Sequence, residues 1–417
     1  MSVLALDIGS SSVRAQRFDD AAEPTGELRQ ETYDTTDAVE VARLVREVLN
    51  GEDPDGVSCF GHSLIALDAK GNPLTPILGW RDTRSADAAE WLCRRLDADA
   101  VHARTGGFLH PSFWPAKLAW LAQTEPDLFR DARRFVSFCD YALGGDTTSI
   151  SIASGTGLLD LTTNDWDAEL LDALALDVER LPRIGEVPVL IDGACSNLGA
   201  GCVGPARAAL MIGTSGALRV LYETGRPQPK PGLFLYRVDP QRVVEGGALS
   251  DGGNLHAWLE RTLTDGGTAR DEHGLTFLPF LGGERSTGWD ADATGTIHGL
   301  TFETTAADIR QAALEGVGFR FAAILDLLPD VEEVIATGGA LFKDDDWVQV
   351  IADALARPVT RSAVEEASLR GAAVAVLADP GDAPLGDTFH PREERAEAYR
   401  SARERQARLY QVLRGEL

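Results

Sequence analysis

The 417-residue sequence has few cysteines and no long apolar run, and each shortage excludes a class of protein. The cysteines are scattered, odd in number and without the paired spacing of a disulfide framework or a zinc site: Cys59, Cys93, Cys139, Cys195 and Cys202. No apolar run approaches the roughly 20 residues that span a bilayer. The opening residues lack the basic segment of a signal peptide. These absences predict a cytoplasmic protein with reduced thiols and no membrane partner.

Basic residues are also scarce. The 39 lysines and arginines face 65 acidic residues, which gives a formal net charge of −26. Such a chain lacks the basic footprint that nucleic acids require, so we expect no nucleic-acid partner. The lysines are Lys70, Lys117, Lys230 and Lys343. A polyanionic ligand would therefore depend on backbone N–H groups, a bound cation and a few arginines, although solubility alone also explains the acidity.

Strand-like and helix-like stretches alternate along the chain, which predicts an α/β fold. In the first half the pattern favours a hairpin at 3–8 and 13–18, a strand at 27–33, a helix over 37–49, and strands at 56–60 and 64–67. In the second half it favours strands at 217–222, 233–238, 242–245 and 331–336, and helices over 254–263, 306–327, 345–356 and 392–413. The last of these helices is charged and is expected on the surface.

One segment occurs twice. Residues 6–12 (LDIGSSS) reappear as residues 210–216 (LMIGTSG), and both continue into a strand-like stretch. The length exceeds what one core usually supports. We therefore place a domain boundary near Gly204 and expect two domains, 1–204 and 205–417.

The repeated turns have the composition of an anion site. Glycine lets the backbone approach an anion closely, and successive N–H groups with hydroxyls form a nest around it. The first turn offers Gly9, Ser10 and Ser11, and the second offers Gly213, Thr214 and Ser215. Asp7 would repel phosphate unless Mg²⁺ lies between them. Both turns could also be plain hairpin turns, which are often rich in glycine and serine.

Longer patterns resemble a known family. Residues 295–300 (GTIHGL), Asp308-Ile309 and residues 312–315 (AALE) are similar to the C-terminal signature of the FGGY carbohydrate kinases, in the actin-like ATPase-fold group. Residues 113–120 resemble the N-terminal signature, with Trp114 where a small residue or proline is usual. The resemblance implies two actin-like ATPase (ribonuclease H-like) α/β domains with a cleft between them. Residues 1–204 would bind a sugar and 205–417 would bind ATP with Mg²⁺.

Asp192 is the candidate catalytic base. It ends an apolar stretch, residues 189–191, and a carboxylate within reach of the sugar hydroxyl suits proton removal during phosphoryl transfer. A carboxylate at this place is also a frequent helix cap. The resemblance of residues 192–199 to the family's catalytic loop favours the base.

A polar cluster with an aromatic residue is the candidate sugar site. If residues 80–84 are extended, Trp80, Asp82 and Arg84 share one side, which suits a polyol. The alternative is a surface ion pair between Asp82 and Arg84. The resemblance adds His62 to this site, and His110 is expected nearby.

Two glycine pairs are candidates for the nucleotide. Gly338 and Gly339 lie in residues 336–340, which resemble the family's adenosine turn, with Lys343 close behind. Gly252 and Gly253 would border the ribose and phosphates. The alternative for Gly338 is a helix start after a strand.

Within the family, the sequence looks most like gluconokinases, with xylulokinases next. Gly61 stands where methionine is usual, and Cys139 lies in a triplet that usually contains lysine. A sugar acid would then depend on Arg84 or another donor. A silent sugar-binding regulator of the same fold and an actin-like structural ATPase are the remaining alternatives. Dimers are common in the family, so we expect a homodimer.

Overall fold

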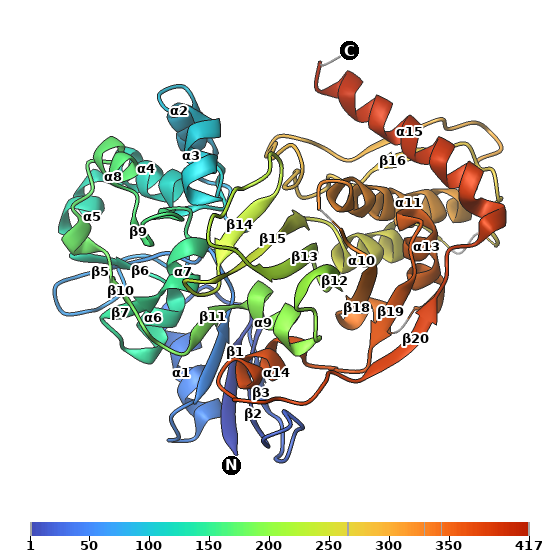
Figure 1. The fold of residues 1–417 in the computed structure, drawn as a ribbon. Coiled ribbons are helices and arrows are strands. Elements are labelled where there is room, and N and C mark those ends of the chain that lie inside the picture. Colours follow the sequence, from blue (N-terminus) through green and yellow to red (C-terminus); the bar gives the residue numbers. More distant parts are fainter. Residues whose placement is uncertain (1, 265–266, 329, 343, 416–417) are drawn as a thin grey trace. The chain divides into compact units, whose positions relative to one another are not determined.

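The computed structural model describes residues 2–264, 267–328, 330–342 and 344–415. Strands and helices alternate along the chain and form two compact units, so the α/β class is confirmed (Figure 1). The first unit comprises Met1–Val203, Leu221–Glu245 and Glu366–Ala383, and the second comprises Gly204–Val220, Gly246–Glu365 and Pro384–Leu417. The first unit thus takes up two segments from beyond residue 204, and each unit contains one of the repeated turns.

The first unit is built on a five-stranded sheet with the order β11-β4-β1-β2-β3. Its strands are β1 (Val3–Ile8), β2 (Ser12–Phe18), β3 (Arg29–Thr32), β4 (Gly56–Cys59) and β11 (Val189–Ile191). β1 pairs antiparallel with β2, whereas β1, β4 and β11 run parallel, with Ile8 beside Cys59 and Cys59 beside Ile191. The carboxyl ends of these three strands therefore meet at one edge of the sheet.

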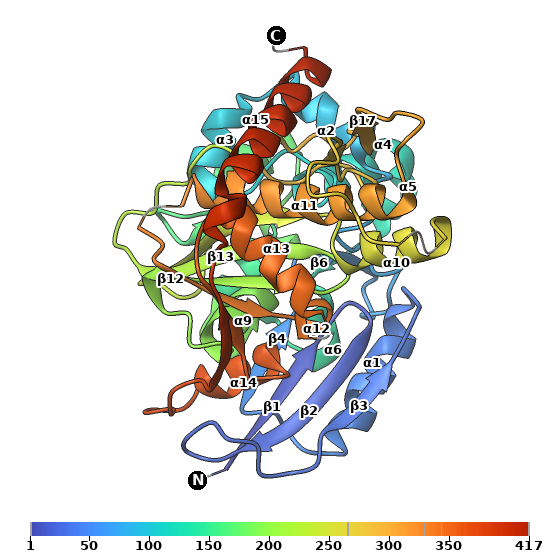
Figure 2. The same ribbon diagram turned by 90° about the vertical axis from the view of Figure 1, so that its right-hand side faces the viewer.

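Helices cover this sheet. α1 (Ala38–Leu49) packs on β2 and β3, and α14 (Ala367–Val374) packs on β1 and β4 (Figure 2). Asp37 caps α1, because its carboxylate accepts hydrogen bonds from the N–H groups of Val39 and Glu40. α14 also lies against α9 (Asp192–Gly199) with almost no gap, since a Cβ on Gly199 would be 1.8 Å from the carbonyl oxygen of Ala367. Only glycine permits that approach.

The rest of the first unit is a helical layer around an apolar cluster that includes Leu64, Trp114 and Leu118. Its helices are α2 (Ala86–Cys93), α3 (Ala98–Thr105), α4 (Trp114–Thr124), α5 (Pro126–Asp131), α6 (Phe138–Leu143), α7 (Ile150–Gly155) and α8 (Ala168–Ala173). Three two-stranded pairs join them: β5 (Ile65–Leu67) with β6 (Arg134–Val136), β7 (Thr147–Ser149) with β10 (Arg183–Gly185), and β8 (Leu159–Asp160) with β9 (Asp165–Trp166).

A seven-stranded sheet with the order β14-β15-β13-β12-β18-β19-β20 carries the second repeated turn. Its strands are β12 (Gly204–Ile212), β13 (Gly216–Glu223), β14 (Phe234–Arg237), β15 (Arg242–Leu249), β18 (Glu333–Thr337), β19 (Val359–Ser362) and β20 (Leu385–Phe389). β12 and β18 are parallel, with Met211 beside Thr337, so their carboxyl ends also meet at one edge. β16 (Thr276–Leu278) and β17 (Thr296–His298) form a separate pair.

The helices of the second unit are α10 (Gly253–Thr262), α11 (Ala306–Leu325), α12 (Gly339–Phe342), α13 (Asp345–Leu355) and α15 (Ala396–Leu413). The predicted helix over 392–413 is present from Ala396, and most of it is exposed. Its inner face is fixed where Gln406 donates to the carbonyl oxygens of Phe277 and Gly316. None of the described helices is both long and apolar enough to cross a bilayer.

Candidate active site

Predicted site residues follow each of the three parallel strands that end at one edge of the first sheet. The turn Gly9–Ser11 follows β1, His62 lies shortly after β4, and Asp192 comes directly after β11. Ligands of open α/β sheets bind outside the carboxyl ends of the strands, so this edge is the natural place for a site. Asp192 is half-buried, and its Oδ1 accepts a hydrogen bond from the N–H of Gly193 at 2.7 Å.

Asp7 is the buried carboxylate of this edge, with 3% of its surface exposed. Its Oδ2 accepts a hydrogen bond from Nη1 of Arg14 at 3.3 Å, and the same nitrogen lies 3.1 Å from Glu366. Burial raises the pKa of Asp7 to about 6; Ser58 and Arg14 lower it, whereas the charges of Asp192 and Glu366 raise it further. Oδ1 of Asp7 has no hydrogen-bond partner among the described residues, so a cation would be stabilised there.

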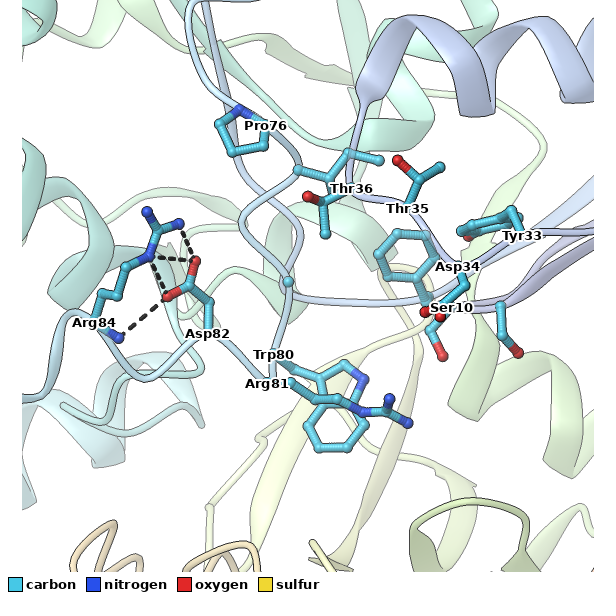
Figure 3. Close-up of a pocket in the computed structure, with 14 residues that line it drawn as sticks. Ser10, Tyr33, Asp34, Thr35, Thr36, Pro76, Trp80, Arg81, Asp82 and Arg84 are labelled. Atoms are coloured by element: carbon cyan, nitrogen blue, oxygen red, sulfur yellow. Dashed lines mark hydrogen bonds and ion pairs between the residues drawn. The ribbon is translucent and has the colours of Figure 1, made fainter. Parts of the chain in front are cut away.

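A cavity of about 650 Å³ lies within the first unit (Figure 3). Ser10 and Ser11 of the first turn line it together with Tyr33, and Trp80 to Asp82 and Arg84 line it as well. Its volume is in the range of small-molecule sites. The structure therefore brings part of the predicted phosphate turn and part of the predicted sugar cluster to one cavity.

The segment after Gly79 is not extended. The premise from which Trp80, Asp82 and Arg84 were expected to share one side is therefore wrong. The N–H of Asp82 donates to the carbonyl oxygen of Gly79 at 3.2 Å, and the chain turns. Asp82 and Arg84 form an ion pair of 2.5 Å. Burial raises the pKa of Asp82, but the hydrogen bonds from Arg84 lower it by more, so the pKa of Asp82 lies below its usual value. The guanidinium of Arg81 stacks on the Trp80 ring, 4.8 Å from its centroid (Figure 3). The turn thus brings Arg81 to the cavity beside Trp80.

The two predicted histidines are buried and do not line the cavity. Nδ1 of His62 is 2.5 Å from the carbonyl oxygen of Gly155, so this nitrogen carries the hydrogen. Nδ1 of His110 accepts a hydrogen bond from the N–H of Ser112 at 3.2 Å, so its hydrogen lies on Nε2. Ser112 in turn donates through Oγ to the carbonyl oxygen of Trp80 at 3.1 Å, which connects His110 to the cavity wall.

The two departures from the family pattern have structural explanations. A Cβ on Gly61 would be 2.5 Å from Cδ1 of Ile191, so Ile191 fills the space that a side chain would need. Cys139 is fully buried and is not part of the cavity wall. Two arginines line the cavity instead: Arg84 is paired with Asp82, whereas Arg81 makes no ion pair among the described residues.

Apart from Ser10 and Ser11, the predicted nucleotide residues that are described belong to the second unit. The turn Gly213–Ser215 joins β12 to β13 and has the same three-residue length as Gly9–Ser11. The N–H of Gly253 donates to the carbonyl oxygen of Gly213 at 2.8 Å, and the N–H of Asn254 donates to that of Thr214 at 3.1 Å. The start of α10, with Gly252 before it, is thereby bound to the turn.

Gly338 completes this cluster at the end of β18. Its φ of 92° lies in the left-handed region, and a Cβ there would be 2.5 Å from the carbonyl oxygen of Ile212. Gly339 has nothing within 4 Å of an added Cβ, and Gly213 meets only Sδ of Met211 at 3.5 Å. Protein packing therefore does not require glycine at either of these two positions. Lys343 lies outside the described residues.

The turn in the second unit has free donors. The backbone N–H groups of Thr214 and Ser215 donate no hydrogen bond within the described part of the chain, and the same is true of Ser10 and Ser11. Two successive unpaired N–H groups in a turn form an anion nest. Both turns thus have the donors that the sequence predicted, whereas the N–H groups of Gly252 to Leu255 are paired within the protein.

Sequence reasoning missed several residues of this region. Arg81 is absent from the predicted cluster because an extended segment would direct its side chain away from that of Trp80. Tyr33 donates its hydroxyl to the carbonyl oxygen of Gly9 and so links β3 to the first turn. Asp251, just before Gly252, is 1% exposed, and burial raises its pKa to about 6. Lys117 is buried and donates to the carbonyl oxygens of His62 and Ser112. Of these four residues, only Lys117 is marked in the sequence, because it is a lysine in an otherwise apolar stretch.

Residues 42–204 match the family model "FGGY family of carbohydrate kinases, N-terminal domain", and residues 208–378 match the corresponding C-terminal domain. The chain belongs to the FGGY family of carbohydrate kinases. This FGGY kinase is a phosphotransferase with an alcohol group as acceptor and ATP as donor, which confirms the family and the activity expected from the sequence.

Relatives of two kinds resemble this FGGY kinase. It is 28% identical to a gluconokinase of Bacillus subtilis (strain 168) over 82% of this chain and 79% of the relative. It is 31% identical to a xylulose kinase of Streptomyces rubiginosus over 75% of this chain and 71% of the relative. The crystal structure of gluconate kinase from Lactobacillus acidophilus superimposes with a TM-score of 0.88 at 25% identity, over 99% of this chain and 98% of that one. The two-domain, actin-like ATPase fold is thereby confirmed.

Proposed function

We propose that this FGGY kinase phosphorylates a hydroxyl of a small open-chain sugar acid, with gluconate as the first candidate. The observation that carries the proposal is the cavity of the first unit, where a phosphate-type turn and the Trp80–Arg84 segment share one space. Trp80 offers an aromatic face to the carbon chain, and Asp82 and Arg84 offer an acceptor and donors to hydroxyl groups. His62 and His110 do not line the cavity, and their proposed part is to support its wall, His110 through Ser112 and the Trp80 carbonyl group.

Arg81 supports an acid over a neutral sugar. Arg84 is already paired with Asp82, whereas Arg81 is stacked on Trp80 and has no carboxylate partner among the described residues. A guanidinium binds a carboxylate through two parallel hydrogen bonds, so Arg81 can hold the acid group of an aldonate. Xylulose is the second candidate, since the xylulose kinase of Streptomyces rubiginosus is 31% identical to this chain.

Asp192 is the proposed base. Its carboxylate follows β11 at the edge that also carries Asp7 and the first turn, and it is half-buried. A carboxylate there would accept the proton of the sugar hydroxyl as the phosphoryl group arrives. An ordinary carboxylate can do this, because the hydroxyl loses its proton only as the new bond forms.

The nucleotide residues proposed are Gly213 to Ser215, with Gly252, Gly253, Gly338 and Gly339 around the base and ribose, and Ser10 and Ser11 on the phosphate side; Lys343, outside the described residues, stays a prediction from the sequence. The residues fit Mg²⁺: no group of three or more metal-ligating side chains gathers within the described ranges, but Mg²⁺ needs only one or two carboxylates when phosphates and water supply the rest. Asp7, with its unpartnered Oδ1, would hold it. Bound Mg²⁺ neutralises charge on the phosphate oxygens.

A cytoplasmic location and a homodimer belong to the same proposal. None of the five cysteines, all of which are described, forms a disulfide, and four of them are buried, which fits a reducing compartment. Size-exclusion chromatography with light scattering tests the dimer.

A coupled assay of ATP consumption over gluconate, xylulose, ribulose, glycerol and erythritol tests the proposed function. We expect turnover with gluconate first. The variant Arg81→Gln should raise KM for gluconate by about 10- to 100-fold, the value of one or two hydrogen bonds to a charged group, and leave any activity on xylulose unchanged. Arg95→Gln is the matched control, because Arg95 also stacks on a tryptophan, Trp91, at 4.2 Å, but away from the cavity.

Two outcomes contradict parts of the proposal. Absence of turnover on every sugar would favour a silent sugar-binding regulator of the same fold. Turnover on xylulose, with an Arg81→Gln variant that behaves like the natural protein, would make this chain a pentulose kinase and exclude the role of Arg81.

A further inference from the structure

Lys117 is a fully buried cation in the helical layer of the first unit. It lies on α4, and 1% of its surface is exposed. Its Nζ donates to the carbonyl oxygen of His62 at 2.6 Å and to that of Ser112 at 2.8 Å. These acceptors are 55 and 5 residues away along the chain, so one side chain joins two separate loops.

Both loops belong to the region where we place the sugar. His62 has a φ of 65°, so its backbone is in the left-handed region that non-glycine residues seldom adopt. Its carbonyl group, held by Lys117, fixes that conformation and with it the ring, which packs edge-on to Phe113 at 4.7 Å. The second loop carries Ser112, whose Oγ donates to the carbonyl oxygen of Trp80.

Stability alone does not explain a lysine here. The neighbours of Lys117 on α4 are apolar and buried, among them Trp114, Leu118 and Leu121. Burial lowers the pKa of Lys117 to about 7, and the nearby charge of Asp82 opposes this shift only in part. A methionine or leucine would avoid the cost of a buried ammonium group. Both the ammonium and the neutral amine have enough N–H groups for the two carbonyl oxygens, so the contacts persist on either side of neutral pH.

We propose that Lys117 is a positioning residue for the sugar: it binds the His62 and Ser112 loops to one helix and so holds His62, His110 and Trp80 in the arrangement that receives the substrate. Lys117 does not line the cavity and makes no direct contact with the sugar in this account. The inference rests on the proposed function, because it assumes that the sugar enters this cavity.

The test compares KM for the sugar with KM for ATP in Lys117→Met. The matched control is Arg180→Met. Arg180 is also a cation that holds two carbonyl oxygens of the first unit, those of Phe129 and Ala132, but it lies away from the cavity. We expect Lys117→Met to raise KM for the best sugar substrate by about 10-fold or more, while KM for ATP changes less than about 2-fold. Arg180→Met should change neither KM.

Lys117→Gln provides a second variant in case the methionine variant does not fold. It keeps one donor, so it should show a smaller rise of KM for the sugar in the same direction. The proposal is overturned if the folded variants bind sugar as the natural protein does, or if both KM values rise together in Lys117→Met and Arg180→Met alike. The proposed function is judged separately, by turnover of the natural protein on any sugar.

Discussion

Replacing Lys117 with methionine should change how the stability of the first unit depends on pH. Burial lowers the pKa of Lys117 from 10.5 to about 7 in the folded protein. Between these two pH values the unfolded chain binds one proton more than the folded chain. The free energy of unfolding of the natural protein therefore rises with pH over this range, and this contribution is lost as pH falls through 7.

The magnitude follows from the same two values. The pKa of Lys117 falls from 10.5 to about 7, a difference of about 3.5. At about 1.4 kcal/mol per pKa unit, the full free-energy cost of the buried charge is about 5 kcal/mol. Methionine removes that cost but leaves two buried carbonyl oxygens without their donor, at about 1–3 kcal/mol each. The two effects nearly cancel at pH 7. At pH 9 the natural protein has recovered about 2 kcal/mol relative to the variant.

Urea unfolding followed by tryptophan fluorescence at pH 7, 8 and 9 measures this difference. The measurement is read at the transition in which the first unit, which contains Lys117, unfolds. Arg180→Met should change the free energy of unfolding by the same amount at each of these pH values, since an arginine does not titrate in this range. A difference between Lys117→Met and the natural protein that stays constant from pH 7 to pH 9 would refute the reasoning that Lys117 is a buried, titrating amine.

Four further substitutions probe the catalytic centre and the nucleotide cluster. Asp192→Asn should lower kcat at least about 100-fold while ATP binding by calorimetry is retained, and full activity would exclude Asp192 as the base. Asp7→Asn should raise the Mg²⁺ concentration needed for half-maximal activity, and an unchanged Mg²⁺ dependence would remove Asp7 from the metal site. Gly338→Ala should destabilise the second unit by about 2 kcal/mol, because of its left-handed φ and the Ile212 carbonyl oxygen, in thermal unfolding. Gly339→Ala should leave stability unchanged and raise KM for ATP; an unchanged KM would contradict its proposed place at the nucleotide.

Local features of the fold could be predicted from the sequence. The two hairpins were found because a short glycine turn between apolar strands is specified by adjacent residues. Helix α1 was placed to within one residue, since its apolar spacing and its Asp37 cap are both local signals. Gly213 and Gly338 could be placed in the same way, because each closely follows a strand whose apolar pattern ends there.

Long-range packing was not predictable in this way. α14 joins β1 and β4 of the first unit although some 300 residues separate them in sequence, and nothing in residues 366–383 indicates this partner except a high content of small residues. The close contact of Gly199 with Ala367 explains that composition only once the structure is known.

Side-chain direction in irregular segments was the other failure. Alternation along residues 80–84 assumed an extended chain, and the hydrogen bond from Asp82 to Gly79 turns the segment instead. Arg81 is therefore at the cavity, and Arg84 is occupied by Asp82. The role of Lys117 could not be foreseen, because its acceptor on His62 is 55 residues away.

The central claim, that the cavity of the first unit receives the sugar, can be tested by filling it. Gly79 lines the cavity, and an added Cβ there meets nothing within 4 Å, so Gly79→Leu should fold normally and occupy the space. Gly225→Leu is the matched control, since Gly225 is equally open but lies away from the cavity.

The decisive measurement is KM for gluconate and for ATP in the natural protein, Gly79→Leu and Gly225→Leu. The account predicts that Gly79→Leu raises KM for the sugar at least about 10-fold, with KM for ATP and the unfolding temperature unchanged, while Gly225→Leu behaves as the natural protein. An unchanged KM for the sugar in Gly79→Leu would contradict the account.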